Sequence, residues 1–108
     1  MPPARTDANQ KEIVQALERT GCVVQDLSAV GQGCPDLLVS KLGVNILLEV
    51  KMPKGKLNSR QEKWHKEWKG QVTVVTSVEE ALAAIDRLTD TPVERYRKAQ
   101  QLRLPWDE

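Results

Sequence analysis

The sequence lacks any apolar run long enough to cross a bilayer. Its first ten residues also lack the apolar core of a signal peptide, so we expect a soluble, cytoplasmic protein that does not contact membranes. It has no internal repeat and no low-complexity tract. With 40% apolar and 29% charged residues the chain is neither disordered nor fibrous in composition, and its 108 residues suffice for one modest core. We therefore expect the functional site to share its helices and strands with that core.

Cysteine is scarce. The two cysteines, Cys22 and Cys34, are too widely separated and too isolated to form a zinc knuckle. In an intracellular protein such thiols are normally kept reduced. We expect both to be packing residues.

An excess of one charge is also lacking, because the net charge is only +1. The distribution is uneven, however, since residues 51–69 hold seven basic residues and two acidic ones. Such a patch is typical of a protein that binds a polyanion, although a solvated helix face has a similar composition.

The pattern of apolar residues and turn signals predicts an alternation of helices and strands. We expect a helix over residues 7–20, ended by Gly21, and a third helix over 78–88 opened by a Ser77–Glu80 capping box. A capping box of Ser59 and Glu62 predicts a second helix over residues 60–69, after a basic loop. The strands are expected at residues 22–27, 35–40, 44–51 and 72–76, with the basic loop at 52–58.

This order of elements predicts the fold class. The second and third strands are joined by a short turn and should form an antiparallel hairpin, whereas a strand, helix, strand crossover implies that the third and fourth strands are parallel. We expect an α/β domain over residues 1–90 with a mixed sheet of about four strands flanked by helices.

The remaining residues, 91–108, form a tail. Thr91 and Pro92 predict a fourth short helix there. Leu102, Leu104 and Trp106 follow it, and they either dock on the domain or bury a dimer partner.

Three charged residues interrupt the otherwise apolar hairpin strands. Side chains alternate along a strand, so Glu49 and Lys51 share one face, and hairpin pairing can bring Asp36 beside Glu49. Two carboxylates at one point repel each other unless a cation lies between them, and carboxylate oxygens are the ligands that Mg²⁺ and Mn²⁺ prefer. A lysine on the same face can orient a water molecule or offset charge on a phosphate. This equipment suits hydrolysis of a phosphodiester.

A simpler interpretation exists for the same residues. Asp36 follows a proline, where aspartate is a common turn residue, and Glu49 with Lys51 can form a solvated ion pair of little energetic value. The apolar residues around Glu49 weaken this interpretation, because a carboxylate is costly to bury without a reason.

The motifs GCPD (33–36), EVK (49–51) and SRQ (59–61) occur in this order on these elements, and together they resemble the VRR-Nuc branch of the PD-(D/E)xK nuclease superfamily. The resemblance implies a restriction-endonuclease-like core and a metal-dependent endonuclease that leaves 5′-phosphate and 3′-hydroxyl ends. It implies that Asp36, Glu49 and the backbone carbonyl of Val50 bind Mg²⁺ or Mn²⁺, and that Lys51 positions the attacking water. Gln61 would assist at the same centre. A glutamate of the first helix would face the metal; it is Glu12, with Glu18 as the alternative.

The resemblance also bears on the substrate. Small stand-alone members of the family resemble Holliday junction resolvases and act as homodimers on branched DNA, which the two-fold axis of a dimer suits. In this chain the basic side chains would hold DNA phosphates without reading sequence: Lys54, Lys56, Arg60, Lys63 and Lys66. We expect Trp64 and Trp68 to be core residues, and no catalytic role for His65. Two alternatives remain, a non-catalytic DNA-binding module of the same fold and a nuclease acting on plain duplex or single-stranded DNA.

Overall fold

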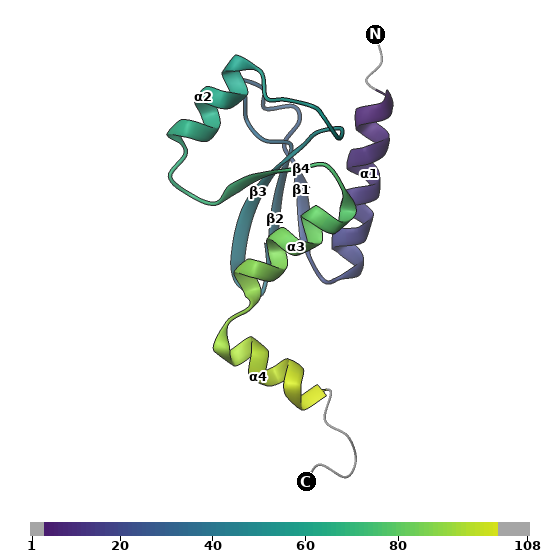
Figure 1. The fold of residues 1–108 in the computed structure, drawn as a ribbon, viewed down its shortest axis with the longest axis vertical. Coiled ribbons are helices and arrows are strands. Elements are labelled where there is room, and N and C mark those ends of the chain that lie inside the picture. The colour runs from purple at the N-terminus through teal and green to yellow at the C-terminus, as the bar shows by residue number, and fades with distance from the viewer. Residues whose placement is uncertain (1–3, 102–108) are drawn as a thin grey trace.

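A computed structural model describes residues 4–101 as a four-stranded sheet with helices around it (Figure 1). Leu102, Leu104 and Trp106, expected to dock on the domain or to bury a partner, lie outside the described residues. The elements are, in chain order, α1 (Ala4–Arg19), β1 (Val23–Asp26), β2 (Leu37–Lys41), β3 (Val44–Val50), α2 (Ser59–Glu67), β4 (Val72–Val75), α3 (Val78–Thr89) and α4 (Pro92–Gln101). Among the described residues, no helix combines the length and the apolar character that a membrane span requires.

The sheet has the strand order β1-β2-β3-β4. β2 and β3 form the expected antiparallel hairpin, in which Leu37 pairs with Leu48, and β4 lies parallel to β3. β1 is antiparallel to β2. The prediction of an α/β fold with a mixed sheet of four strands is therefore confirmed.

The core lies between one face of this sheet and the helices α1 and α3. Period-two alternation places Leu37 and Val39 of β2 on that face, together with the β3 residues Ile46, Leu48 and Val50. All five are buried, and α1 and α3 pack against them as well as against each other. Glu49 therefore belongs to the opposite face of β3.

The buried residues of helix α1 determine which of its faces packs against the core. Ile13 and Leu17, four residues apart, are completely buried. The helix ends as predicted at Gly21, which has φ +94°, a conformation that glycine adopts without strain. The amide of Cys22 donates to the carbonyl of Leu17, and that of Gly21 to Glu18, which is the Schellman pattern of hydrogen bonds. Cys22 itself is buried in the core, as expected of a packing residue.

The predicted cap of α2 is wrong by one residue. The helix is capped by Asn58 rather than Ser59: Asn58 has extended backbone angles, and its side chain accepts a hydrogen bond from the amide of Gln61 at 2.9 Å. Gln61, not Glu62, completes the capping box, because its side-chain oxygen accepts a hydrogen bond from the amide of Asn58 at 3.0 Å. Helix α2 consequently begins at Ser59, and Gln61 is fixed in its first turn.

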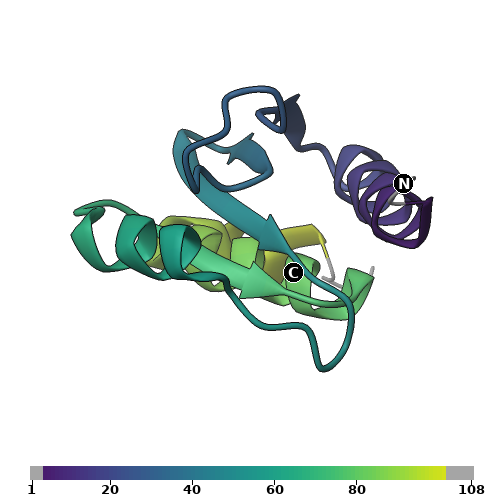
Figure 2. The same cartoon turned by 90° about the horizontal axis from the view of Figure 1, so that it is seen from above.

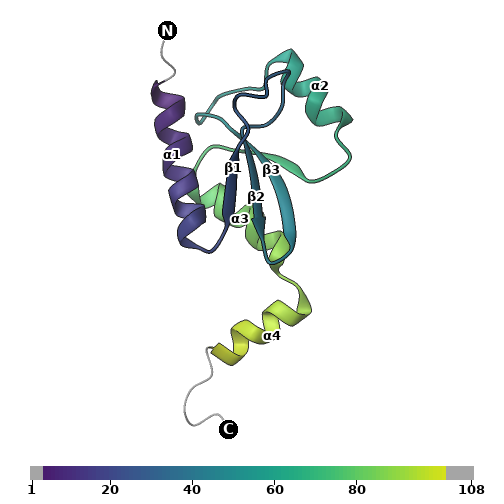
Figure 3. The same cartoon turned by 180° about the vertical axis from the view of Figure 1, so that it is seen from behind.

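Two helices stand apart from the two-layer core. Figures 1 and 3 show α2 beyond one end of the strands, and Figure 2 shows it on the side away from α1. The fourth helix is present at Pro92–Gln101, and Figures 1 and 3 show it extending away from the rest of the molecule. An ion pair of 3.8 Å between exposed Arg95 and Asp90 lies near its start.

Candidate active site

The strand pairing brings Asp36 to Glu49. Since Leu37 pairs with Leu48, one step further along both strands places Asp36 opposite Glu49. The Asp36 carboxylate is fixed there, because its Oδ2 accepts a hydrogen bond of 2.8 Å from the amide of Val50. The N–H and C=O of a strand residue point to the same side, so the Val50 carbonyl also faces the Asp36 side of β3. The spatial convergence of these three residues agrees with the sequence pattern.

Glu49 is a buried carboxylate with one unpartnered oxygen. Its side chain is only 2% exposed, and among the described residues no group hydrogen-bonds to its Oε1. Burial raises the pKa of Glu49 to about 8, the nearby Asp36 carboxylate adds to the rise, and the Lys51 ammonium opposes it. Without a further cation, this carboxyl group is therefore held largely protonated at neutral pH.

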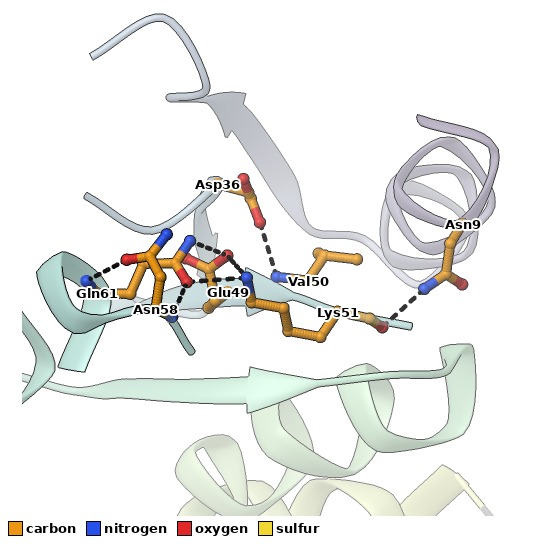
Figure 4. A network of polar contacts seen from close by, with 7 residues as sticks. All are labelled: Asn9, Asp36, Glu49, Val50, Lys51, Asn58 and Gln61. Atoms are coloured by element: carbon orange, nitrogen blue, oxygen red, sulfur yellow. Dashed lines mark hydrogen bonds and ion pairs between the residues drawn. The ribbon is translucent and has the colours of Figure 1, made fainter. Parts of the chain in front are cut away.

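Lys51 and Gln61 surround the other oxygen of Glu49. Lys51 Nζ lies 3.7 Å from Glu49 Oε2, and Gln61 Nε2 donates to the same oxygen at 3.3 Å. Lys51 Nζ also donates to Gln61 Oε1 at 2.8 Å. Figure 4 shows these side chains converging from β3 and from the start of α2. The structure thus brings together four of the five side chains that the family resemblance implied.

Glu12 is not among them, and the prediction that it faces the carboxylates needs correction. Both Glu12 and its alternative Glu18 are exposed on α1, and among the described residues no group of three metal-ligating side chains exists. The phase of the helix explains the difference, because Ile13 and Leu17 occupy the buried stripe and turn Glu12 away from it.

The residue that α1 contributes instead is Asn9, which was not among the residues predicted from the sequence. Asn9 lies one turn before Ile13 on the same stripe. Its Nδ2 donates to the carbonyl of Lys51 at 3.0 Å (Figure 4). It also reaches the carbonyl of Thr76 at 3.5 Å. It thereby joins the ends of β3 and β4 beside the site. The spacing of four residues to Ile13 was the signal that could have identified it.

The loop before β2 packs against the first turn of α2. A Cβ atom added to Gly33 would lie 2.5 Å from the carbonyl oxygen of Arg60, so only glycine allows this loop to pack against the first turn of α2. Cys34 follows, half-buried, and burial together with the negative charges of Glu49 and Asp36 raises the pKa of its thiol. Cys34 therefore lies beside the carboxylate pair, unlike Cys22, which is a core residue.

His65 lies one turn after Gln61 on α2. Its Nε2 is buried and has no hydrogen-bond partner among the described residues. Burial, and to a smaller extent the Lys51 ammonium, lowers the pKa of its imidazole. The lowered pKa favours the neutral ring, and among the described residues no hydrogen bond or ion pair joins it to either carboxylate.

The residues present fit a hard divalent cation. The buried, unpartnered oxygen of Glu49 has no compensation for its lost hydration, and the adjacent Asp36 carboxylate makes its ionisation costlier. A cation between the two would relieve both costs. Two carboxylates plus the Val50 carbonyl form an all-oxygen donor set of the kind that Mg²⁺ and Mn²⁺ take, with water completing the coordination.

A basic surface borders these residues. The side chains on it are exposed, and they are Lys54, Lys56, Arg60, Lys63 and Lys66. The first two lie in the loop that follows β3, where the amide of Gly55 closes a turn by donating to the carbonyl of Met52 at 2.7 Å. The last three lie on α2. Lys63 approaches Glu67 at 3.9 Å, but both side chains are exposed and such a pair contributes little.

The tryptophans of α2 are not core residues, contrary to the prediction. Trp68 is 46% exposed and Trp64 is half-buried. Their rings stack on each other with centroids 4.6 Å apart and an interplanar angle of 19°. The helix buries no residue completely, and Figure 1 shows it beyond one end of the strands, away from α1 and α3.

Comparison with known proteins agrees with this geometry. Residues 3–82 match the family described as VRR-NUC domain. A solved structure described as a VRR_NUC domain is similar to this chain, with a TM-score of 0.64 and 31% sequence identity over 75% of this chain and 94% of the other. No curated protein matches significantly. The matched residues include Asn9, Asp36, Glu49, Lys51 and Gln61.

Proposed function

This chain belongs to the VRR-NUC family of nuclease domains, and we propose that it is a metal-dependent endodeoxyribonuclease that hydrolyses phosphodiester bonds in branched DNA. The observation that supports the proposal most is the pair of a half-buried Asp36 and a buried Glu49 with an ammonium group beside it. Glu49 carries an oxygen that nothing among the described residues satisfies. A structural ion pair would not need such an arrangement.

Asp36, Glu49 and the Val50 carbonyl would hold Mg²⁺ or Mn²⁺. What a divalent ion supplies at such a centre is Lewis acidity, which favours ionisation of water and offsets the charge that develops on the phosphate. The hydrogen bond from the Val50 amide fixes Asp36 Oδ2 and so orients the carboxylate. Because Glu49 is buried, bulk water would not readily replace it as a ligand of the ion. The Glu49 carboxyl group must lose its proton before the ion can bind.

Lys51 would act on the reacting groups directly. Its ammonium group is held beside Glu49 by Gln61 and keeps donor capacity, because an ammonium group has three N–H donors. A donor there can orient the attacking water and stabilise negative charge on the phosphate oxygens in the transition state. Gln61 would keep both Lys51 and Glu49 in place through its two side-chain hydrogen bonds.

The exposed basic side chains would hold the DNA backbone. Replacing Lys56 and Lys66 together by alanine is expected to weaken DNA binding several-fold and to make the plot of log K against log salt concentration less steep by about 1 to 2. The reason is that binding releases fewer counterions from the DNA when the protein makes fewer phosphate contacts. Fluorescence anisotropy across a salt series measures both quantities.

A matched control removes two basic side chains elsewhere, Lys11 on α1 and Arg87 on α3, both exposed. It should leave the salt dependence unchanged. An equal loss in both double variants would mean that net charge, and not this surface, governs binding.

Branched DNA and a homodimer are the finer part of the proposal. Two equivalent sites related by a two-fold axis suit a substrate in which two equivalent strands are cut. The test is cleavage of end-labelled four-way junction, flap, duplex and single-stranded DNA with Mg²⁺, Mn²⁺ or EDTA. Paired, symmetrical cuts confined to the junction support the proposal. Cleavage of plain duplex alone would make it a nuclease of different specificity, and binding without cleavage in either metal would make it a non-catalytic module.

A further inference from the structure

A single side chain links the catalytic lysine to the cap of helix α2. Gln61 Oε1 accepts two hydrogen bonds, one from Lys51 Nζ at 2.8 Å and one from the amide of Asn58 at 3.0 Å. Its Nε2 donates to Glu49 Oε2. The carboxamide is therefore shared between the first turn of α2 and the charged groups of β3 (Figure 4).

Asn58 makes two hydrogen bonds with Gln61, one to its side chain and one to its backbone. Its backbone amide donates to the side chain of Gln61, and its own side chain accepts from the backbone amide of Gln61 at 2.9 Å. The turn is also fixed from the other side, where Gly33 approaches the backbone of Arg60 too closely for a Cβ atom. The first turn of α2 therefore holds Gln61 in a fixed position.

The position of the Lys51 ammonium group depends on its hydrogen bond with Gln61. Its side chain is 19% exposed, and its distance of 3.7 Å to Glu49 is longer than a good charge-assisted hydrogen bond. The contact with Gln61, at 2.8 Å, is the shorter of the two that the structure records for the ammonium group. A flexible four-carbon side chain with only the longer contact would sample several rotamers.

We propose that Asn58 is a positioning residue for the reaction: by capping α2 it fixes Gln61, and through Gln61 it fixes the Lys51 ammonium group. The inference rests on the proposed nuclease function. It also gives α2 two tasks, because the helix that carries Arg60 and Lys63 toward DNA phosphates is the one that holds the lysine in place.

The test compares Asn58→Ala, which removes the accepting side chain, with Asn58→Ser, which retains a capping oxygen. Asn58→Ala is expected to lower kcat about tenfold and to leave the Kd for DNA within about twofold, because displacement of a catalytic group costs rate rather than binding. Asn58→Ser should restore kcat to within about threefold of wild type, since serine caps helices nearly as well. A fall in affinity with unchanged kcat would overturn the proposal.

A matched control removes an equivalent cap outside the site. Ser77 caps α3 by accepting a hydrogen bond from the amide of Glu80 at 3.1 Å. Ser77→Ala should lower the thermal midpoint about as much as Asn58→Ala and leave kcat unchanged. If Ser77→Ala lowered kcat equally, the effect of Asn58→Ala would be one of general stability, and the inference would be wrong.

A second readout does not depend on cleavage. The ammonium signal of Lys51 in a ¹H–¹⁵N NMR spectrum, assigned with Lys51→Met, should be slowed in exchange in the wild type and in Asn58→Ser, and broadened or lost in Asn58→Ala. An unchanged signal in Asn58→Ala would overturn the inference about Asn58 and leave the proposed nuclease function untouched. A wild type that cleaves no DNA would overturn the proposed function, and the inference with it.

Discussion

Glu49→Gln is expected to abolish DNA cleavage, with a loss of roughly 10³-fold or more in the single-turnover rate, and to bind DNA as tightly as the wild type. The substitution keeps the size and hydrogen-bonding shape of the side chain but removes the negative charge that would hold the metal ion. Glu49 is almost fully buried, so DNA does not contact it and affinity should be preserved. Cleavage is followed on a labelled four-way junction with protein in excess.

Two further variants serve as a second test and as a matched control. Asp36→Asn should give a loss of similar size, since the Asp36 carboxylate is the other half of the pair. Glu79→Gln makes the same chemical change on the exposed first turn of α3 and should leave the rate unchanged. Retention of cleavage by Glu49→Gln would remove the carboxylate pair from the mechanism.

The stability of the metal-free protein should fall steeply as the pH rises, and Glu49 is the cause. Its pKa is raised from 4.5 to about 8 in the folded protein, so below pH 4.5 the carboxyl is protonated in both folded and unfolded states and has no effect on their balance. Between pH 4.5 and 8 the unfolded chain ionises while the folded protein keeps its proton. Folding then becomes less favourable, by an amount on the order of 3–5 kcal/mol above pH 8.

Glu49→Gln tests this linkage, because glutamine resembles the protonated glutamate and does not titrate. In EDTA the two proteins should have the same thermal midpoint near pH 4.5, and the variant should be more stable at pH 8 by about 10 °C or more. Circular dichroism melts across the pH range measure the difference. Adding Mn²⁺ at pH 8 should raise the midpoint of the wild type and not that of Glu49→Gln. Equal midpoints at pH 8 without metal would contradict the assignment of Glu49 as a buried, destabilising carboxylate.

The sheet and the carboxylate pair could be predicted from the sequence because period-two alternation leaves little freedom. A one-residue shift of β3 would turn Leu48 away from the core formed with α1 and α3 and would turn Glu49 into it, so the apolar pattern fixes the register of the hairpin. That register alone places Asp36 opposite Glu49. The GCPD and EVK motifs then supplied the family, and residues 3–82 match it.

Helix phase and helix caps could not be predicted as well. One residue of a helix turns the side chain by about 100°, so identifying Asn9 instead of Glu12 required knowing that Ile13 and Leu17 lie at the centre of the buried stripe. The cap of α2 was ambiguous because Asn58 and Ser59 are both good capping residues, and only the backbone angles of Asn58 decide between them. Trp68 was expected to be buried, but α2 lies over the end of the sheet, where a large side chain remains partly exposed.

The central claim is that hydrolysis depends on a divalent ion held by Asp36 and Glu49. The most direct test is to form the complex of the wild-type protein with a four-way junction in EDTA and then to add Mn²⁺ in excess. We expect strand cleavage to begin on this addition and to yield 5′-phosphate and 3′-hydroxyl ends that a ligase can rejoin. Cleavage before the addition, or none after it in either Mn²⁺ or Mg²⁺, would show that hydrolysis does not depend on such an ion.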